Sequence, residues 1–218
     1  MSTTLYFLRL DFLRDPSVYE KMRACASIER RLRADRYRLP EDRIRCLGAG
    51  LLLQFATGLT DADLAYGPAG KPYCPSRPEL SFSLSHSGMM AVLVVSGRIC
   101  GADVEQIRPE RESFRLIAAR YFTEEERQEV YGPADEEESG FDAAAFARLW
   151  TKKEAYVKMT GEGIAAFHRT GEEPCFYPEA GVLPGYALSI CLQGEEAEEI
   201  EFREVTPEDL ERKYKCLK

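Results

Sequence analysis

The sequence MMAVLVVSGRICGADVE, residues 89–105, gives the strongest indication of the fold of this chain of 218 residues. It contains two apolar runs, Met89–Val95 and Ile99–Val104, separated by Ser96-Gly97-Arg98. Apolar runs of this length that are bounded by turn residues are typical of strands. A short glycine-containing break between them favours a tight reversal, so the stretch predicts two strands joined as a hairpin.

The second run contains Asp103 and is followed directly by a second acid, Glu105. Because side chains alternate along a strand, the two carboxylates share one face while Ala102 and Val104 point into the core. Two neighbouring carboxylates repel each other, and a hard divalent cation such as magnesium is their natural occupant. The alternative is a solvated strand end that binds nothing. This pair alone leaves both interpretations open.

The flanking sequence mixes further strands with helices. We expect strands at residues 4–13, 80–84, 183–192 and 199–205. We expect helices within residues 16–38, from Pro40 to Gly58, at 112–120, from Thr123, and from Asp142 to about Met159. Residues 67–72 and 132–140 have the composition of loops. Each half therefore mixes both kinds of element, which indicates an α+β fold. A duplicated unit fits this order, although the residues show no internal repeat.

The segment Trp150–Lys158 places Glu154 and Lys158 four residues apart, on one face of a predicted helix. As an ordinary helix pair they would contribute roughly 0.3 kcal/mol to stability. As a functional pair they would bring a carboxylate to a metal ion and an ammonium group to a phosphate. Trp150 lies on the same stripe and is interpreted as a core anchor. The pair alone is compatible with either role.

A third candidate is Phe82–Gly88, in which His86 stands between Ser85 and Ser87. Small hydroxyls and an imidazole at the end of a strand can hold a phosphate. A histidine that merely caps the strand is an equal alternative. Upstream, Lys71 offers a cation from a loop, although exposed loop lysines are usually only solvated. The segment therefore indicates an anion site without establishing one.

The charge of the chain is unevenly distributed. The formal net charge of −8 argues against general nucleic-acid binding, which requires a surplus of Lys and Arg. Residues 23–45 nevertheless carry eight arginines, whereas residues 124–138 are strongly acidic. A basic segment within an acidic protein indicates a local anion site.

The cysteines and the apolar segments predict the compartment. The chain has 7 cysteines and 2 histidines, without a C-x-x-C pair. We therefore expect reduced thiols in a cytoplasmic protein, not a disulfide framework or a tetrahedral zinc site. Charge interrupts the first apolar run at Arg9, too early for a signal peptide. No stretch approaches the roughly 20 apolar residues of a membrane span, so we expect no membrane association.

Taken in order, these segments resemble the 4′-phosphopantetheinyl transferases of the single-chain, surfactin-synthetase-activating (Sfp) type. Gly101–Glu105 resembles that family's G-[IV]-D-[IV]-E motif, and Trp150–Lys158 its W-x-x-K-E-[AS]-x-x-K motif. Phe82–Gly88 resembles F-[NS]-[IL]-S-H-S, and Gly70–Pro72 the G-K-P before it. Phe122–Glu126 resembles F-x-x-x-E, although a T-x-x-E capping box is a sufficient explanation for Glu126. Glu126 therefore stays outside the expected metal site.

The resemblance implies a fold and a set of site residues. The implied fold is a pseudo-two-fold α+β monomer of two similar halves, residues 1–101 and 102–218, with the active site at their interface. The implied magnesium ligands are Asp103, Glu105 and Glu154. The implied catalytic residues are Glu154 and Lys158. The implied coenzyme A contacts are Arg30, Arg33, Arg45, Lys71, Ser85, His86 and Lys158.

Two residues depart from the family pattern. Cys46 replaces a small hydroxyl, which removes or replaces one phosphate contact, and Ala102 replaces a larger aliphatic residue, which affects packing only.

The resemblance also implies a reaction. A serine hydroxyl of an acyl or peptidyl carrier protein attacks the β-phosphorus of coenzyme A, and adenosine 3′,5′-bisphosphate leaves. The arginine-rich segment and the loop after Arg120 are both candidates for docking the carrier protein.

Two other functions use the same residues. A magnesium-dependent nucleotide or phosphate-ester hydrolase would turn over coenzyme A without a carrier. A non-catalytic coenzyme A or carrier-protein binder would be indifferent to magnesium.

Overall fold

The computed structural model describes residues 2–132, 140–163, 175–178 and 183–214. The helices are α1 (Pro16–Cys25), α2 (Ile28–Asp35), α3 (Pro40–Thr57), α4 (Glu112–Tyr121), α5 (Glu124–Tyr131), α6 (Ala143–Thr160) and α7 (Pro207–Tyr214). The strands are β1 (Thr3–Arg9), β2 (Ala65–Tyr66), β3 (Pro72–Tyr73), β4 (Ser81–Ser87), β5 (Met90–Ser96), β6 (Cys100–Gln106), β7 (Cys175–Pro178), β8 (Tyr186–Leu192) and β9 (Ile200–Glu204). Short 3₁₀ turns lie at Asp11–Arg14 and Asp61–Asp63. The predicted α+β class is confirmed.

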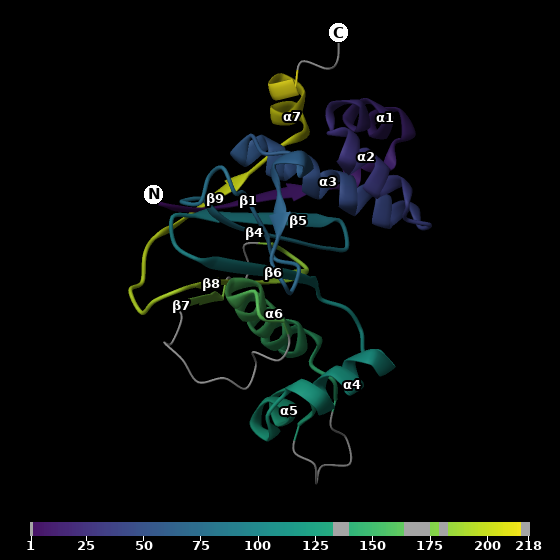
Figure 1. Ribbon diagram of the computed structural model, residues 1–218. Coiled ribbons are helices and arrows are strands. Elements are labelled where there is room, and N and C mark those ends of the chain that lie inside the picture. The colour runs from purple at the N-terminus through teal and green to yellow at the C-terminus, as the bar shows by residue number, and fades with distance from the viewer. Residues whose placement is uncertain (1, 133–139, 164–174, 179–182, 215–218) are drawn as a thin grey trace.

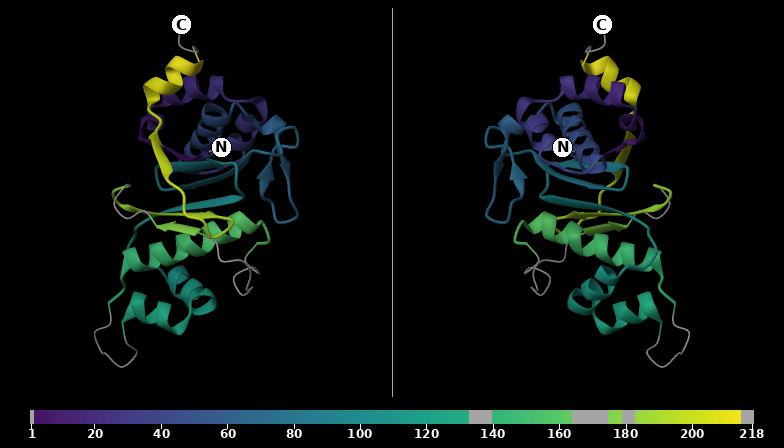
Figure 2. Two further views of the ribbon diagram at one scale, coloured as in Figure 1. Left: turned by 90° about the vertical axis from the view of Figure 1, so that its left-hand side faces the viewer. Right: turned by 90° about the vertical axis from the view of Figure 1, so that its right-hand side faces the viewer.

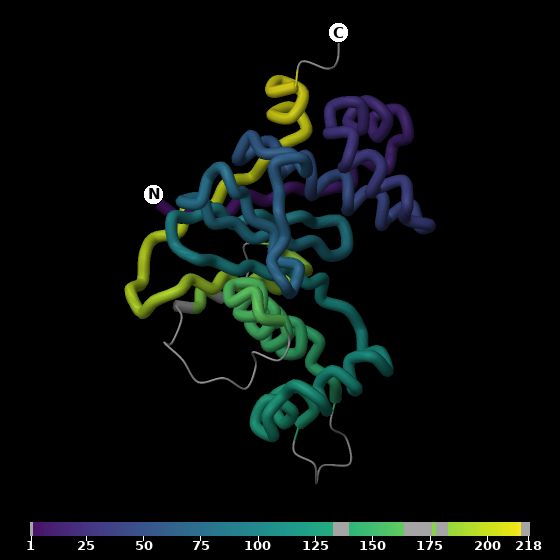
Figure 3. Tube along the Cα trace, in the orientation of Figure 1, coloured from purple at the N-terminus to yellow at the C-terminus, as the bar shows by residue number. Residues whose placement is uncertain are grey.

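These elements are stacked in layers. Helices α1, α2, α3 and α7 lie above a sheet of order β4-β5-β1-β9, and a second sheet of order β6-β8-β7 lies below it (Figures 1 and 2). Helix α6 covers the outer face of the second sheet, and α4 and α5 lie beyond it (Figure 1). Strand β9 runs parallel to β1, so segments near the two ends of the chain lie side by side (Figure 3). The division at residue 101 and the pseudo-two-fold relation of the halves stay predictions.

Strand β5 explains why two sheets form. Its alternate side chains belong to two different cores, one beneath the helices and one between the sheets. The first set is Ala91, Leu93 and Val95, and the second is Met90, Val92 and Val94. A strand that is covered on both faces reads as a continuous apolar run. The predicted strands are therefore present.

The predicted hairpin is wrong. Strand β5 pairs with β1 and β4, whereas β6 pairs with β8 in the other sheet. The turn after Ser96 carries the chain from one layer to the next, because the apolar face of β6 packs against β5 across the inter-sheet core. Local sequence cannot distinguish such a layer change from a hairpin.

The two long helices begin and end where their sequences predict. Helix α3 starts with Pro40 and ends at Gly58, whose φ of 76° suits glycine. Helix α6 is capped by Asp142, which accepts two backbone N–H groups, and it ends at Gly161. At Gly101 a Cβ atom would lie 1.9 Å from the carbonyl oxygen of Ala155. Glycine at this position of β6 therefore lets α6 lie directly on the strand.

A ladder of serine side chains joins the two sheets. Strands β4 and β6 belong to different sheets, yet the alternate serines of β4 accept hydrogen bonds from alternate backbone N–H groups of β6. The pairs, with N···O distances, are Cys100–Ser81 (3.1 Å), Ala102–Ser83 (3.0 Å), Val104–Ser85 (3.5 Å) and Gln106–Ser87 (3.1 Å). The ladder satisfies the outward N–H groups of β6 and fixes its register against β4.

Two further observations bear on the sequence predictions. Within the described residues no helix has the length and apolar character that crossing a membrane requires. Cys46, Cys74 and Cys100 are free thiols. The predicted loop at residues 132–140 lies largely outside the described residues.

Candidate active site

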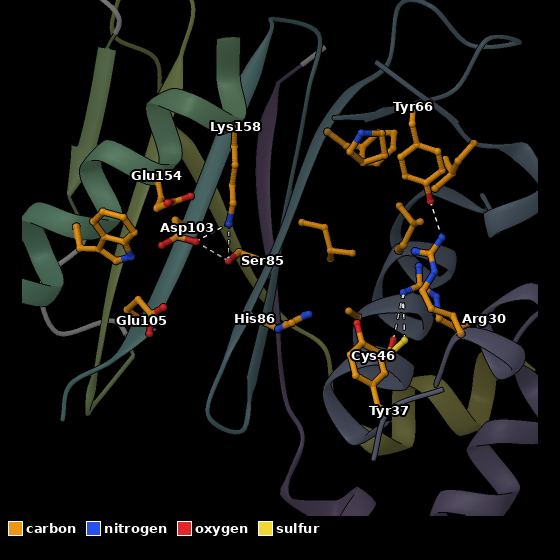
Figure 4. A pocket seen from close by; sticks show the side chains of 18 residues that line it. Arg30, Tyr37, Cys46, Tyr66, Ser85, His86, Asp103, Glu105, Glu154 and Lys158 are labelled. Atoms are coloured by element: carbon orange, nitrogen blue, oxygen red, sulfur yellow. Dashed lines mark hydrogen bonds and ion pairs between the residues drawn. The ribbon is translucent and has the colours of Figure 1, made fainter. Parts of the chain in front are cut away.

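A pocket of about 430 Å³ lies between the helical layer and the α6–β6 layer. Carboxylates and Lys158 form one end of it and arginines the other, with His86 between them (Figure 4). Most of the residues proposed from sequence line this pocket. They are Arg30, Arg33, Ser85, His86, Asp103, Glu105, Glu154 and Lys158. Segments that lie far apart in the sequence therefore meet in one cavity.

The carboxylate end is built on β6 and α6. Asp103 and Glu105 face the pocket, while Ala102 and Val104 lie in the core between the sheets. The predicted alternation along this strand is confirmed. Helix α6 adds Glu154 at the same end of the pocket, beside Asp103 (Figure 4).

Asp103 is the centre of a compact hydrogen-bond group. The Lys158 ammonium lies 2.5 Å from Asp103 Oδ1 and 2.9 Å from Ser85 Oγ. Ser85 donates its own proton to Asp103 Oδ1 at 2.7 Å. The Asp103 side chain is only 6% exposed, but its second oxygen, Oδ2, is buried without a hydrogen-bond partner in the described structure. A buried carboxylate oxygen without a partner is energetically costly.

The other two acids, Glu105 and Glu154, both have raised pKa values. The pKa of Glu154 is raised, first by burial and then by the nearby charge of Asp103. The pKa of Glu105 is raised mainly by burial, against the opposing effect of its hydrogen bond from Ser87 Oγ at 2.6 Å. Among the described residues, no hydrogen bond or ion pair reaches the Glu154 carboxylate. Lys158 pairs with Asp103, and its charge also lowers the pKa of Glu154 and, together with Arg108, that of Glu105, against the effect of burial.

This arrangement fits a divalent cation chemically. Within the described ranges no three ligating side chains are grouped closely enough to hold a metal ion as they stand, and Lys158 Nζ instead lies beside Asp103. The donors are nevertheless hard carboxylate oxygens, and one of them is buried without a partner. A bound cation would lower both raised pKa values. Asp103, Glu105 and Glu154 therefore suit magnesium.

At the arginine end, part of the positive charge is offset by a carboxylate that the sequence analysis did not identify, Asp61. Arg30 Nε donates to Asp61 Oδ2 at 2.8 Å, and Arg33 Nη1 lies 3.3 Å from Asp61 Oδ1. Arg33 also donates to the Tyr66 hydroxyl at 2.7 Å. Arg30 Nη1 donates to the backbone oxygen of Cys46 at 3.3 Å. Two guanidinium groups are therefore held beside each other, as an anion site requires.

His86 lies between the two ends of the pocket (Figure 4). Its pKa is lowered, chiefly by desolvation and then by the positive charges of Lys158, Arg45 and Arg30. A bound anion would offset the effect of these positive charges on the His86 pKa.

Lys71 and Arg45 do not line this pocket. Lys71 Nζ donates to the backbone oxygens of Cys100 at 3.1 Å and Met159 at 2.7 Å, so it ties its loop to the ends of β6 and α6. Arg45 donates to the backbone oxygen of Gly88 at 3.2 Å and also pairs with Asp42. Their contacts with coenzyme A stay predictions. In this structure both side chains support the loops around the pocket.

Two other residues from the motifs have structural contacts. The Glu126 side chain accepts from the N–H of Thr123 and completes the predicted capping box. Glu126 also pairs with Lys153 of α6 at 2.9 Å, which links α5 to α6. Trp150 packs with the apolar cluster of α4–α6 and also lines the pocket. Its interpretation as a core anchor is therefore incomplete.

Comparison with known proteins agrees with the geometry. A model of the 4′-phosphopantetheinyl transferase superfamily matches residues 99–179, which include β6 and α6. A 4′-phosphopantetheinyl transferase of Bacillus subtilis is 28% identical over 195 residues, covering 79% of this chain and 84% of that protein. The transferase HetI of Nostoc is 31% identical over 175 residues, covering 76% and 72%. AcpT of Salmonella typhimurium is 40% identical over 101 residues, covering 45% and 50%.

The chain belongs to the 4′-phosphopantetheinyl transferase family. It is therefore an enzyme of the transferase class.

Proposed function

We propose that this enzyme transfers the 4′-phosphopantetheine arm of coenzyme A to a serine of an acyl or peptidyl carrier protein, with magnesium, and releases adenosine 3′,5′-bisphosphate. The observation that carries the proposal is the two-ended pocket. It joins carboxylates and Lys158 to a pair of arginines within about 430 Å³. A ligand with a diphosphate and a separate nucleotide phosphate matches this pocket. The diphosphate would lie at the end with Lys158 and the metal-binding carboxylates, and the nucleotide phosphate at the end with the arginines. The names of the relatives support the reaction class.

In this proposal Asp103, Glu105 and Glu154 would hold magnesium, which would supply positive charge to the diphosphate oxygens. Glu154 accepts the proton of the carrier serine, because it lines the pocket beside Asp103 and Lys158. Lys158 moves its ammonium from Asp103 to the leaving phosphate and stabilises the charge there. Ser85 and His86 contact the phosphates between the two ends.

The nucleotide end contributes binding and orientation. Arg30 and Arg33 face the pocket with guanidinium groups that are already fixed, so little order is lost when a phosphate binds. This binding positions the reacting diphosphate near Glu154 and Lys158. The proposed division of labour gives nucleotide binding to residues 1–101 and the metal site to residues 102–218.

The proposal places the carrier protein at a second cleft, of about 180 Å³, which shares Glu105 and Trp150 with the pocket. Arg108, Arg111 and Phe114 also line this cleft. Carrier proteins are acidic, so a chain of net charge −8 needs a local basic surface to attract one. In this proposal, Arg111→Glu should raise the KM for the carrier and leave coenzyme A binding unchanged. An unchanged KM for the carrier would exclude this surface.

The decisive experiment incubates the protein with apo carrier protein, coenzyme A and magnesium, and reads the mass of the carrier. A gain of one phosphopantetheine is expected with the wild type and not with Glu154→Gln. Release of coenzyme A fragments without carrier would favour the hydrolase. Binding of coenzyme A that ignores magnesium, with no mass gain on several carriers, would favour the non-catalytic binder. A cytoplasmic, monomeric protein is part of the same proposal.

A further inference from the structure

Arg30 carries a buried charge, and the backbone of α3 leaves space for its side chain. The residue is only 6% exposed, and its side chain crosses α3 at Gly50. A Cβ atom on Gly50 would lie 2.4 Å from Arg30 Nε and 2.6 Å from Arg30 Cδ. The absence of a side chain at position 50 therefore gives the guanidinium its path to the pocket. A buried charge of this kind persists only when it is paired.

Asp61 supplies that pairing for both arginines at once. Its side chain is 5% exposed and lies in the short turn Asp61–Asp63, behind the pocket wall. One carboxylate oxygen, Oδ2, accepts from Arg30, and the other, Oδ1, lies beside Arg33. The two arginines are three residues apart on α2, so their like charges would otherwise push the side chains apart. One carboxylate thus holds two guanidinium groups side by side.

The charge of Asp61 and its orienting effect on the two arginines predict opposite effects on phosphate binding. A carboxylate beside a phosphate site repels the phosphate, so charge alone predicts that Asp61 weakens anion binding. Orientation predicts the opposite, because two fixed guanidinium groups bind a phosphate better than two that repel each other. The variant Asp61→Asn separates the two effects. It keeps the size of the side chain but replaces one acceptor by an amide that faces a guanidinium.

We propose that Asp61 is a positioning residue for phosphate recognition, acting through Arg30 and Arg33. The inference rests on the proposed function, in which these two arginines bind the phosphates of the nucleotide. Asp61 itself does not line the pocket. It determines how the two positive groups are presented.

The test is calorimetric binding of adenosine 3′,5′-bisphosphate, without magnesium or carrier protein. Asp61→Asn should weaken binding about tenfold. The matched control is Asp63→Asn, which removes one negative charge from the same turn without touching either arginine. It should leave the affinity unchanged. Tighter binding by a folded Asp61→Asn protein would mean that the charge of Asp61 outweighs its orienting effect, and equal binding would mean that Asp61 has no net effect; either result would overturn the proposal.

A second variant covers the case in which Asp61→Asn does not fold. Gly50→Ala leaves Asp61 in place but displaces Arg30, and it should also weaken binding about tenfold. A folded Gly50→Ala protein with wild-type affinity would contradict the role of the Arg30–Asp61 pair. In turnover assays each variant should raise the KM for coenzyme A and leave kcat nearly unchanged, which general destabilisation would not do.

The same measurements separate this inference from the function on which it rests. A wild-type protein that does not bind adenosine 3′,5′-bisphosphate would overturn the proposed nucleotide end, and the role of Asp61 with it. Wild-type binding together with an insensitive Asp61→Asn variant would overturn the role of Asp61 alone. The double variant Asp61→Asn with Arg33→Ala should lose less affinity than the sum of the two single changes, because both act on one arrangement.

Discussion

At one end of the pocket Arg30 and Arg33 share the carboxylate of Asp61, while at the other Lys158 pairs with Asp103, beside Glu105 and Glu154. The arginine end sets two guanidinium groups against one carboxylate, so it keeps a net positive charge for an anion, although Asp61 Oδ1 is buried without a hydrogen bond. The carboxylate end keeps a buried oxygen of Asp103 without a partner and two acids with raised pKa values. One end is therefore built to bind as it stands, and the other requires an additional positive charge.

The largest effect is expected at the carboxylate end, from Glu154→Gln. The change removes the proposed proton acceptor and should lower kcat about a thousandfold while the fold stays intact. The measurement is carrier mass gain against time, with circular dichroism to verify folding. Glu112→Gln, on the exposed face of α4, is the matched control and should retain full activity. An active Glu154→Gln protein would remove Glu154 from the mechanism.

Lys158→Ala should lower kcat about a hundredfold, because the leaving phosphate loses its cation. The same change leaves Asp103 buried without a charge partner, which should cost about 3 kcal/mol of stability in the absence of magnesium. Urea unfolding and single-turnover assays measure the two effects. Lys152→Ala, an exposed lysine of the same helix, should change neither. Wild-type turnover by Lys158→Ala would exclude the assigned role.

A smaller effect is expected at the arginine end. Arg33→Ala removes one charge-assisted contact and should weaken coenzyme A binding about tenfold, with kcat nearly unchanged. Arg36→Ala is the control, since this exposed arginine does not line the pocket. Titration calorimetry compares the two. Equal affinities would separate the basic segment from nucleotide binding.

The smallest effect is the pH dependence of stability without metal. Because the folded pKa of Glu154 lies above its ordinary value of 4.5, the unfolded chain releases this proton first as the pH rises. Stability should therefore decrease as the pH rises above 4.5, and Glu154→Gln should flatten the decrease. Saturating magnesium should reverse it, by about 2.7 kcal/mol at a concentration one hundred times the Kd. Thermal melts from pH 4 to pH 8 test this, and stability that rises with pH in metal-free protein would contradict the assignment.

The sequence predicts well whatever depends on local chemistry. Caps and glycines determine the ends of α3 and α6, and strand alternation places Asp103 and Glu105 on one face. The expected hairpin after Val95 is wrong because the choice between a hairpin and a layer change is made by distant partners, β1 and β8. Asp61 was missed for a related reason. Nothing in its own turn indicates that two arginines from α2 lie against it.

The position of side chains around the loops was equally hard to predict. Lys71 belongs to a motif-like loop, and its sequence cannot reveal that its ammonium binds two backbone oxygens from β6 and α6. The glycine at position 50 gives a partial signal, because glycine inside a helix usually requires a reason. The reason, close passage of Arg30, is visible only in three dimensions.

The serine ladder between β4 and β6 means that the length of β4 cannot change without loss of the contacts that its serines make. Ser85 and Ser87 each accept from a backbone N–H of β6 and donate to an acid, Asp103 or Glu105. Insertion or deletion of one residue in β4 would turn every later hydroxyl to the opposite face. The inter-sheet bonds and the orientation of both carboxylates would then be lost together. A substitution in β4 affects the contacts of one residue, whereas an insertion or deletion disrupts the contacts of all the serines that follow it.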